Sequence, residues 1–323
     1  VLASGGSYTC VFTEFVSGDY SGPAHENTAT VVASDNDGNS DTESDDATVA
    51  FEDVLPDVAI TKTANPTSVP ETGANVEFTV VVTNNSLEDA SIDSLVDSDF
   101  DLATHCADAV GTVLASGVSY TCVFTEFITG DHSGPVHENT ATVVASDDDG
   151  NTDTESDDAT VTFDDVLPDV SITKTAGLTS VTEPGADVEF TVVVTNNSLE
   201  DATIDSLVDS DFDLAANCAD AVGTVLAFGE SYTCVFTEYV AGNASGDDHE
   251  NTVTVVASDN DGNSDEASDN ATVEFTDVAP VINVDKTAGQ LEVFAPGEDV
   301  TFTVVIDNDS VSTDPVTIDS LVD

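Results

Sequence analysis

The chain repeats itself with a period of 112 residues, and this repetition limits its possible folds more than any other feature. A motif that reads YTCVFTEF, or YTCVFTEY in its last copy, begins at Tyr8, Tyr120 and Tyr232. Self-similarity at a fixed period indicates a tandem array in which each repeat is one structural unit. The repeat predicts four segments, namely the C-terminal part of a split repeat at 1–53, full repeats at 54–165 and 166–277, and the N-terminal part of a split repeat at 278–323.

The two partial repeats complement each other in the strands that they would contribute. Neither part could bury an apolar face by itself, and an unfilled sandwich would expose strand edges that promote aggregation. We therefore expect the half-domains to be completed head to tail along a filament axis. This completion would occur either by strand donation between separate copies or within one longer tandem chain, so the expected partner is the chain itself.

Apolar and polar residues alternate within a repeat, which is typical of β-strands with one buried face. Val188, Phe190 and Val192 would face one side of a strand, and Glu189 and Thr191 the other. Strands are expected near 169–175, 187–196, 203–208, 222–228, 231–240, 250–258 and 268–276. Seven short strands in about 110 residues are typical of an immunoglobulin-like (Ig-like) sandwich. The predicted fold class is all-β, with tandem Ig-like antiparallel β-sandwiches and no amphipathic helix.

Four segments of the second full repeat carry a resemblance to a known family. They are DVSITKTA at Asp169–Ala176, EPGADVEFTVVVTNNS at Glu183–Ser198, ENTVTVVASDNDGNSD at Glu250–Asp265 and SDNATVEF at Ser268–Phe275. Over essentially its whole length, the chain resembles the prokaryotic surface repeat called domain of unknown function eleven. The resemblance implies Ig-like sandwiches strung in tandem within large secreted or cell-surface proteins. It implies no catalytic residues, and we do not expect an enzyme.

The chain is extremely acidic, because 65 Asp and Glu residues oppose only 3 basic residues and give a formal net charge of −62. The basic residues, Lys62, Lys174 and Lys286, occupy one equivalent position in successive repeats. So few cations cannot replace the counterions of nucleic-acid phosphates, and an anionic membrane surface would repel the chain. The sequence contains no apolar run of about 20 residues. We therefore expect neither nucleic-acid binding nor direct insertion into a membrane.

The cysteine spacing also repeats. Cys106 and Cys122 are 16 residues apart, as are Cys218 and Cys234, and Cys10 aligns with the second member of each pair. We expect disulfides between Cys106 and Cys122 and between Cys218 and Cys234, which suit an extracellular or cell-surface protein. Buried free thiols are an alternative, and a metal pair is another, although no C-x-x-C spacing exists.

The acidic residues gather in loops rather than on the expected strand faces. The heptapeptide DNDGNSD and its variants place oxygen-bearing side chains at positions 1, 3, 5 and 7, with a glycine at position 4 for the bend. Calcium loops gather carboxylates in this alternating way, although the position of the glycine excludes an EF-hand. The candidate ligands in these loops are Asp35, Asp37, Asn39 and Asp41, then Asp147, Asp149, Asn151 and Asp153, and finally Asp259, Asp261, Asn263 and Asp265.

Two further acidic clusters recur along the chain. The cluster that follows the third expected strand contains Asp97, Asp99 and Asp101 in one repeat, and Asp209, Asp211 and Asp213 in the next. The linkers before the full repeats contain Glu52, Asp53 and Asp57, and Asp164, Asp165 and Asp169. Clustered carboxylates repel one another, and hardly any basic residue is available to neutralise them. Oxygen-only ligands suit Ca²⁺ best, so the predicted cofactor is Ca²⁺.

The topology of a seven-stranded sandwich predicts where these ions bind. Loops after the second and sixth strands should share a pole with the N-terminal linker, so that 196–201 and 259–265 face 164–169. Loops 97–101 and 130–134 of the preceding repeat should approach from the other side. We therefore expect calcium at the seams between repeats, where it would stiffen each joint.

Other interpretations of these motifs stay open. The DNDGN sequence is also a favoured hairpin turn, and adaptation to high salt would raise the acid content, although chiefly on exposed strand faces. A HEN tripeptide recurs at His25, His137 and His249, but no fixed histidine cluster accompanies it, so neither zinc nor catalysis is expected. N-glycosylation sequons, whose asparagines are also typical of turns, occur at Asn84, Asn196, Asn243, Asn270 and Asn308.

Two functions from different classes fit these observations. The first is a structural subunit of a calcium-stiffened extracellular filament or surface stalk. The alternative is the repeat region of a ligand-binding cell-surface adhesin. Nearly identical repeats favour the structural function, because a binding site usually diverges in its loops. Aromatic residues make up only 6% of the chain and tryptophan is absent, which leaves little for a recognition hot spot.

Overall fold

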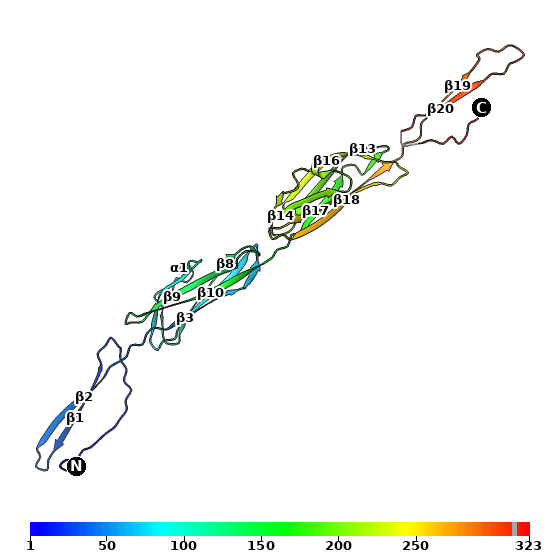
Figure 1. Cartoon of the computed structure of the whole chain (residues 1–323). Coiled ribbons are helices and arrows are strands. Elements are labelled where there is room, and N and C mark those ends of the chain that lie inside the picture. Colours follow the sequence, from blue (N-terminus) through cyan, green and yellow to red (C-terminus); the bar gives the residue numbers. More distant parts are fainter. Residues whose placement is uncertain (312–314) are drawn as a thin grey trace. The chain divides into compact units, whose positions relative to one another are not determined.

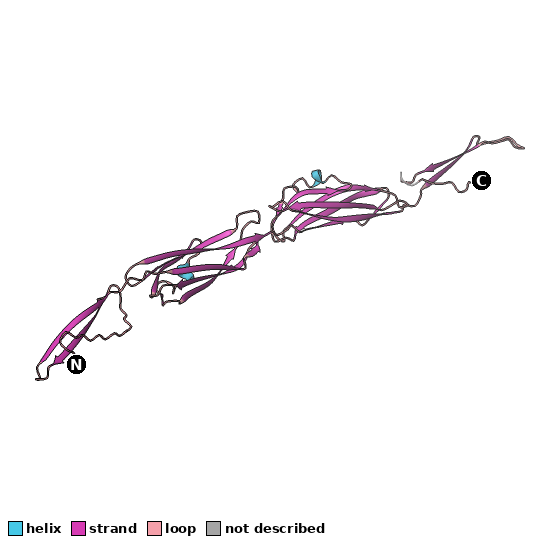
Figure 2. Ribbon diagram, turned by 60° about the horizontal axis from the view of Figure 1, so that its bottom comes forward, coloured by secondary structure: helices cyan, strands magenta, loops and turns pink. Residues whose placement is uncertain are grey.

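The computed structural model describes residues 1–311 and 315–323, and the chain divides into two compact units (Figure 1). The first unit contains Val1–Gly130 and Gly134–Asp164, and the second contains Asp131–Ser133 and Asp165–Asp323. Residues 312–314, which belong to the predicted partial repeat 278–323, lie outside the described residues. Strands make up almost all of the regular structure (Figure 2), which confirms the predicted all-β class. In the described parts of the chain, no helix is long and apolar enough to cross a membrane.

The first unit contains a hairpin followed by a complete β-sandwich. The hairpin consists of β1 (His25–Ser34) and β2 (Ser40–Val49). The sandwich elements are β3 (Val58–Asn65), β4 (Ser68–Pro70), β5 (Ala74–Asn84), β6 (Ala90–Asp97), α1 (Leu102–His105), β7 (Val113–Leu114), β8 (Ser119–Ile128), β9 (His137–Ser146) and β10 (Thr152–Asp164). One sheet has the strand order β3-β5-β8, and the facing sheet has the order β4-β10-β9-β6-β7.

The second unit contains the equivalent sandwich followed by a second hairpin. The sandwich elements are β11 (Val170–Ala176), β12 (Ser180–Thr182), β13 (Gly185–Asn196), β14 (Ala202–Asp209), α2 (Leu214–Asn217), β15 (Val225–Leu226), β16 (Ser231–Ala241), β17 (His249–Ser258) and β18 (Ser264–Thr276). The hairpin consists of β19 (Ile282–Ala288) and β20 (Phe302–Asn308). The sheets have the orders β11-β13-β16 and β12-β18-β17-β14-β15, so the two sandwiches share one topology.

The alternating sequence pattern explains the core of each sandwich. On β5, Val76, Phe78 and Val80 are fully buried, whereas the intervening Glu77 is exposed. Val143 on β9 of the facing sheet is also fully buried and belongs to the same hydrophobic cluster. The apolar faces of the two sheets therefore close on each other, as the period of two predicts.

Three local features differ from the sequence-based expectation. The short strands β4 and β12 are not expected from alternation, and each pairs in parallel with the last strand of its sandwich, whereas the other pairings are antiparallel. The segment after β6 forms one helical turn, α1, at whose N-terminus Asp101 accepts a hydrogen bond from the backbone N–H of Ala103. These elements are too short for a sequence period to be visible.

Disulfides anchor the irregular segment that follows each helical turn. Cys106 is bonded to Cys122 on β8, and Cys218 is bonded to Cys234 on β16, which are the two pairs that the cysteine spacing predicts. All four cysteines are buried, and each pair joins an irregular segment to the three-stranded sheet. Closing a loop of about 15 residues in this way stabilises a domain by about 3 kcal/mol in the chain-entropy model.

Among the described residues, no second sheet faces the hairpins β1–β2 and β19–β20. Val31 on β1 is 62% exposed, whereas Val143, its counterpart in the first sandwich, is fully buried. Val284 on β19 and Phe302 and Val305 on β20 are exposed in the same way. The completion of these hairpins by further repeats stays a prediction.

Candidate metal centre

The predicted calcium loop between β9 and β10 closes on itself through side-chain hydrogen bonds. Asp147 accepts from the backbone N–H of Asn151 at 2.8 Å and from the Asn151 amide at 2.9 Å. Gly150 has a φ of 89°, which only glycine adopts readily. In the second unit, Asp259 accepts from Asn263 at 2.9 and 3.0 Å in the same arrangement. The loop is therefore a hairpin turn, and its first aspartate is nearly buried in both domains.

A linker carboxylate lies against each of these loops. Asp53 Oδ2 accepts from the Asn151 amide at 3.2 Å, and Asp165 Oδ2 accepts from the Asn263 amide at 3.0 Å. Residues that are 98 positions apart in the sequence are thus brought together. The structure confirms this part of the topological argument, in which the linker shares a pole with the loop after the sixth strand.

Several carboxylate oxygens at this pole are buried without a hydrogen-bond donor. Among the described residues, no donor reaches Oδ1 of Asp53 or Asp165, or either carboxylate oxygen of Asp261. A buried charged oxygen without a partner is strongly unfavourable. A cation bound at this pole would supply the missing interaction, so the side chains present fit an oxygen-ligated metal ion.

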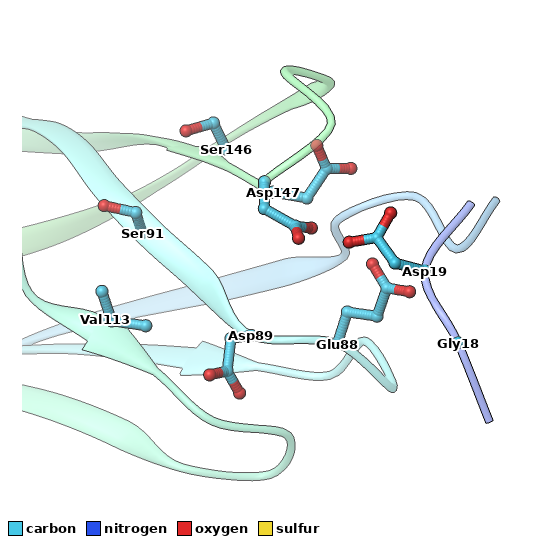
Figure 3. Close-up of a pocket in the computed structure, with 9 residues that line it drawn as sticks. Gly18, Asp19, Glu88, Asp89, Ser91, Val113, Ser146 and Asp147 are labelled. Carbon is cyan, nitrogen blue, oxygen red and sulfur yellow. The ribbon is translucent and has the colours of Figure 1, made fainter. Parts of the chain in front are cut away.

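An acidic pocket of about 440 Å³ opens beside the loop in the first unit. It is lined by Gly18, Asp19, Glu88, Asp89, Ser91, Val113, Ser146, Asp147 and Asp148. Figure 3 shows that the carboxylates of Asp19 and Glu88 lie next to each other and face Asp147. A pocket of about 370 Å³ in the second unit is lined by the equivalent Glu200, Asp201, Thr203, Val225, Asp259 and Asn260. The acidic pocket is therefore a repeated feature of the full domains.

The carboxylates around this pocket disfavour one another's ionisation. Desolvation, followed by the charges of Asp148 and Asp149, raises the pKa of Glu88 above its ordinary value. The pKa of Asp149 is also raised, by desolvation and by the charges of Asp19, Asp148 and Asp53. Although desolvation opposes it, hydrogen bonding from Asn151 keeps the pKa of Asp147 below its ordinary value. The pocket thus concentrates negative charge that a divalent cation would neutralise.

Asn84 and Asn196 hold the loops that contribute Glu88 and Glu200 to the acidic pockets. Asn84 is fully buried, and its amide donates to the backbone carbonyls of Glu88 at 2.7 Å and Leu114 at 2.8 Å. Its Oδ1 accepts from the Ser86 N–H at 2.9 Å. Asn196 makes the equivalent bonds. These asparagines position the acidic loop, and their burial makes both sequons inaccessible in the folded domain.

The remaining candidates from the DNDGN-type loops lie elsewhere. Asp153 and Asp265 accept from the backbone N–H groups of Val58 and Val170, both at 2.8 Å, and so fix the first strand of each sandwich. In the first hairpin, Asp35 accepts from Asn39 at 2.8 and 2.9 Å, and its neighbours Asp37 and Asp41 are exposed.

Of the linker candidates, only Asp53 and Asp165 reach the loop through their side chains. The side chains of Glu52, Asp57, Asp164 and Asp169 are exposed. The carbonyls of Asp57 and Asp169 instead accept from the N–H groups of Asn85 and Asn197, both at 2.7 Å. These backbone bonds attach each linker to the loop that carries Glu88 or Glu200.

The acidic cluster after the third strand does not form the metal site that was predicted there. Asp97 and Asp209 contact the amines of Lys62 and Lys174 with one oxygen and accept an asparagine amide with the other, so neither carboxylate is open to a metal ion. Asp101 and Asp213 are the N-cap residues of α1 and α2. Asp99 and Asp211 are exposed beside them. The assignment of Asp97 and Asp209 as metal ligands is therefore wrong.

The lysine and asparagine groups that contact these aspartates do not follow from the local sequence. Lys62 and Lys174 were visible as the single basic residue of each full repeat, and Asn139 and Asn251 as part of the HEN motif. Their proximity depends on strands that are far apart in the sequence. The recurrence of a lone lysine in a chain of charge −62 was the signal that could have pointed to them.

Comparisons with known proteins yield structural similarities only. No family model matches the chain, and no curated protein matches it. A protein of unknown function from Porphyromonas gingivalis is 10% identical over 67% of this chain and 99% of its own, with a TM-score of 0.24.

Two further solved structures are similar at the same low level. A Ca²⁺-stabilized adhesin that helps an Antarctic bacterium reach out and bind ice is 17% identical over 80% of this chain and 59% of its own, with a TM-score of 0.26. Mouse clustered PcdhgC3 EC1-3 is 14% identical over 79% and 78%, with a TM-score of 0.22. At such TM-scores, the similarities assign neither a ligand nor a partner to this chain.

Proposed function

We propose that this chain is a structural segment of an extracellular filament or surface stalk, and that Ca²⁺ bound at the linker pole of each Ig-like repeat stiffens it. The observation that carries the proposal is the buried Oδ1 of Asp53 and of Asp165, which no donor among the described residues reaches, beside the loop asparagines Asn151 and Asn263. The ion would be held by side chains from the linker, the DNDGN-type loop and the acidic pocket. These are Asp53, Glu88, Asp147 and Asp149 in the first unit, and Asp165, Glu200, Asp259 and Asp261 in the second.

The shortage of basic residues supports Ca²⁺, rather than a basic side chain of the protein, as the group that neutralises the clustered carboxylates. The chain has 3 basic residues against 65 acids, and Lys62 and Lys174 are already committed to Asp97 and Asp209 in the domain interiors. Ca²⁺ accepts six to eight oxygen ligands in flexible geometry, whereas Mg²⁺ keeps several waters and fewer carboxylates. A pole with several carboxylates from separate loops therefore suits Ca²⁺.

Repetition and the disulfides support a structural function outside the cell. The two domains share the same topology, the same pocket and the same loop contacts, as expected of a spacer whose units are interchangeable. Disulfides are stable chiefly in oxidising environments. The exposed apolar faces of the two hairpins would be covered by further repeats, either in a longer chain or in a neighbouring copy. We propose no catalytic activity for the chain.

Calorimetry of the chain in excess Ca²⁺ and in EDTA tests this function. A ligand that binds only the folded state raises the free energy of unfolding by about 2.7 kcal/mol at a concentration one hundred times Kd. We expect higher transition temperatures in Ca²⁺ than in EDTA, with Mg²⁺ at equal ionic strength giving a smaller increase. Identical transitions in all three solutions would refute the calcium proposal.

A further inference from the structure

Each full domain buries an amine, a carboxylate and an amide in mutual contact inside its core. In the first unit, Lys62 on β3 donates from Nζ to Oδ2 of Asp97 at the end of β6. Asn139 on β9 donates from Nδ2 to Oδ1 of the same carboxylate at 3.0 Å. In the second unit, Lys174, Asp209 and Asn251 repeat this arrangement, with an amide-to-carboxylate distance of 2.9 Å.

These groups are shielded from water. The side chains of Lys62 and Asp97 are 0% exposed, as are those of Lys174 and Asp209. The rings of Phe78 and Phe100 lie 5.3 and 5.8 Å from the lysine Nζ. An ion pair taken out of water in this way loses hydration that its mutual attraction often fails to restore.

The amide is only half satisfied. Asn139 and Asn251 are fully buried, and among the described residues neither Oδ1 atom has a hydrogen-bond donor. A buried carbonyl oxygen without a donor is costly, and natural cores contain few of them. Each full domain therefore holds a lysine amine and an asparagine amide on one aspartate carboxylate, in a site shielded from water.

We propose that Lys62 and Asn139, and likewise Lys174 and Asn251, are joined by an amide bond between the lysine Nζ and the asparagine Cγ. Asp97 and Asp209 would act as the proton carriers of the reaction. The proposal does not rest on calcium binding, which concerns a different set of side chains at the linker pole.

The reaction balances with the groups present. The Asp97 carboxylate takes a proton from the Lys62 ammonium, and the freed amine attacks Cγ of Asn139. The new Nζ–Cγ bond forms, the Cγ–Nδ2 bond breaks, and the proton carried by Asp97 passes to the departing nitrogen. The second proton that Nζ loses follows through the same carboxylate, so that the nitrogen leaves as ammonium and Asp97 is again ionised. Overall, an ammonium side chain and a carboxamide become a secondary amide and an ammonium ion, so neither an oxidant nor an external co-reactant is needed.

The environment favours each step. Burial, acting against the hydrogen bond and charge of Asp97, lowers the pKa of Lys62, which promotes the neutral amine that can attack. Because both nitrogen groups bind the two oxygens of one carboxylate, the reactants are held side by side before reaction. The same carboxylate can accept the first proton and deliver it to the leaving group, as general acid–base catalysis requires.

The bond would connect the two layers of the sandwich. Strand β3 belongs to the three-stranded sheet and β9 to the five-stranded sheet, and β11 and β17 have the same relation in the second unit. A covalent link between facing sheets restricts the unfolded chain in the way that a disulfide does, but reduction does not break it. Such a link suits a chain that must resist extension.

Intact mass spectrometry of the full chain, reduced and denatured, tests the proposal directly. The expected mass is below the sequence mass by two molecules of ammonia, one for each full domain. Because the chain has only 3 basic residues, all lysines, trypsin provides a second readout. Acylation of Lys62 and Lys174 would block cleavage after both residues, while cleavage after Lys286, whose side chain is 38% exposed, would show that the protease is active.

Two variants distinguish the assigned partners. Asn139→Ala should restore cleavage after Lys62 and leave a deficit of one ammonia, with Lys174 and Asn251 as the intact internal control. Asn85→Ala, at an exposed position, should keep the full deficit. An unmodified mass with cleavage after Lys62 and Lys174 would overturn the proposal. A deficit of water rather than ammonia would also overturn it, because the aspartate would then be the bonded partner.

Discussion

Replacement of Asn196 by alanine should destabilise the second unit far more than its small size suggests. The side chain is fully buried and makes three hydrogen bonds, two to the carbonyls of Glu200 at 2.6 Å and Leu226 at 2.8 Å, and one from the Ser198 N–H at 2.9 Å. Each hydrogen bond contributes a net free energy of about 1 kcal/mol to stability, and a carbonyl that stays buried after losing its donor adds a further desolvation cost. We therefore expect a loss of about 3 kcal/mol in the free energy of unfolding.

Hydrogen exchange followed by mass spectrometry at fixed Ca²⁺ can measure this loss separately in each unit. A change of about 3 kcal/mol accelerates exchange through global opening by roughly 100-fold. Peptides from β13 and β14 should show this acceleration in Asn196→Ala, and peptides from β5 and β6 should not, because distant sites are nearly independent.

The neighbouring asparagine provides the matched control for this experiment. Asn197 is exposed, and its amide makes a single bond of 3.2 Å to Ser171 Oγ. Asn197→Ala should change the free energy of unfolding by less than about 0.5 kcal/mol. Equal exchange rates in the two variants would show that the buried asparagine does not hold the acidic loop.

Two further predictions concern the disulfide of the first unit and the equivalent tyrosines of the two units. Replacing Cys106 and Cys122 together by serine removes the bridge and should lower the free energy of unfolding by about 3 kcal/mol, measured by urea titration; an unchanged midpoint would contradict this. Burial and the bond to Asp108 raise the pKa of Tyr120 to about 12, and Tyr232 is shifted equally. Because the folded state holds these protons more tightly, their contribution to stability is complete below pH 10.0, the ordinary tyrosine value, and is lost as the pH rises towards 12. A phenolate absorbance titration should show the fraction that ionises near pH 12 fall by half in Tyr120→Phe, where Tyr232 still contributes, and disappear in Tyr120→Phe/Tyr232→Phe; its persistence in the double variant would contradict the assignment.

The strands were predictable where alternation is long enough to be seen. The expected strand at 187–196 lies within β13, and the expected strand at 250–258 lies within β17. The three residues of β12 offer no period, and their parallel pairing with β18 depends on a contact between segments about ninety positions apart. The helical turns were missed because a single turn has too few residues to show an apolar face.

The candidate site was predictable in its chemistry and only partly in its membership. The glycine in the DNDGN-type loop and the acids around it could be identified from the sequence. The pole of the sandwich at which the linker meets this loop could also be predicted. Sequence could not separate Asp53, which reaches Asn151, from Asp97, which instead contacts Lys62. Both lie in acidic stretches, and only the folded sheets determine whether a carboxylate meets a lysine or remains beside other carboxylates.

Calorimetric titration of the chain with Ca²⁺ tests the central proposal most directly. The variant Asp53→Asn/Asp165→Asn removes the linker carboxylate from both sites, and Glu77→Gln/Glu189→Gln removes the same charge from exposed strand positions as the control. We predict saturable Ca²⁺ binding by the native chain and by the control, and binding weakened by roughly tenfold or more in the linker variant, since ligand charge sets affinity. Absence of binding by the native chain, or equal affinity in both variants, would contradict the proposal.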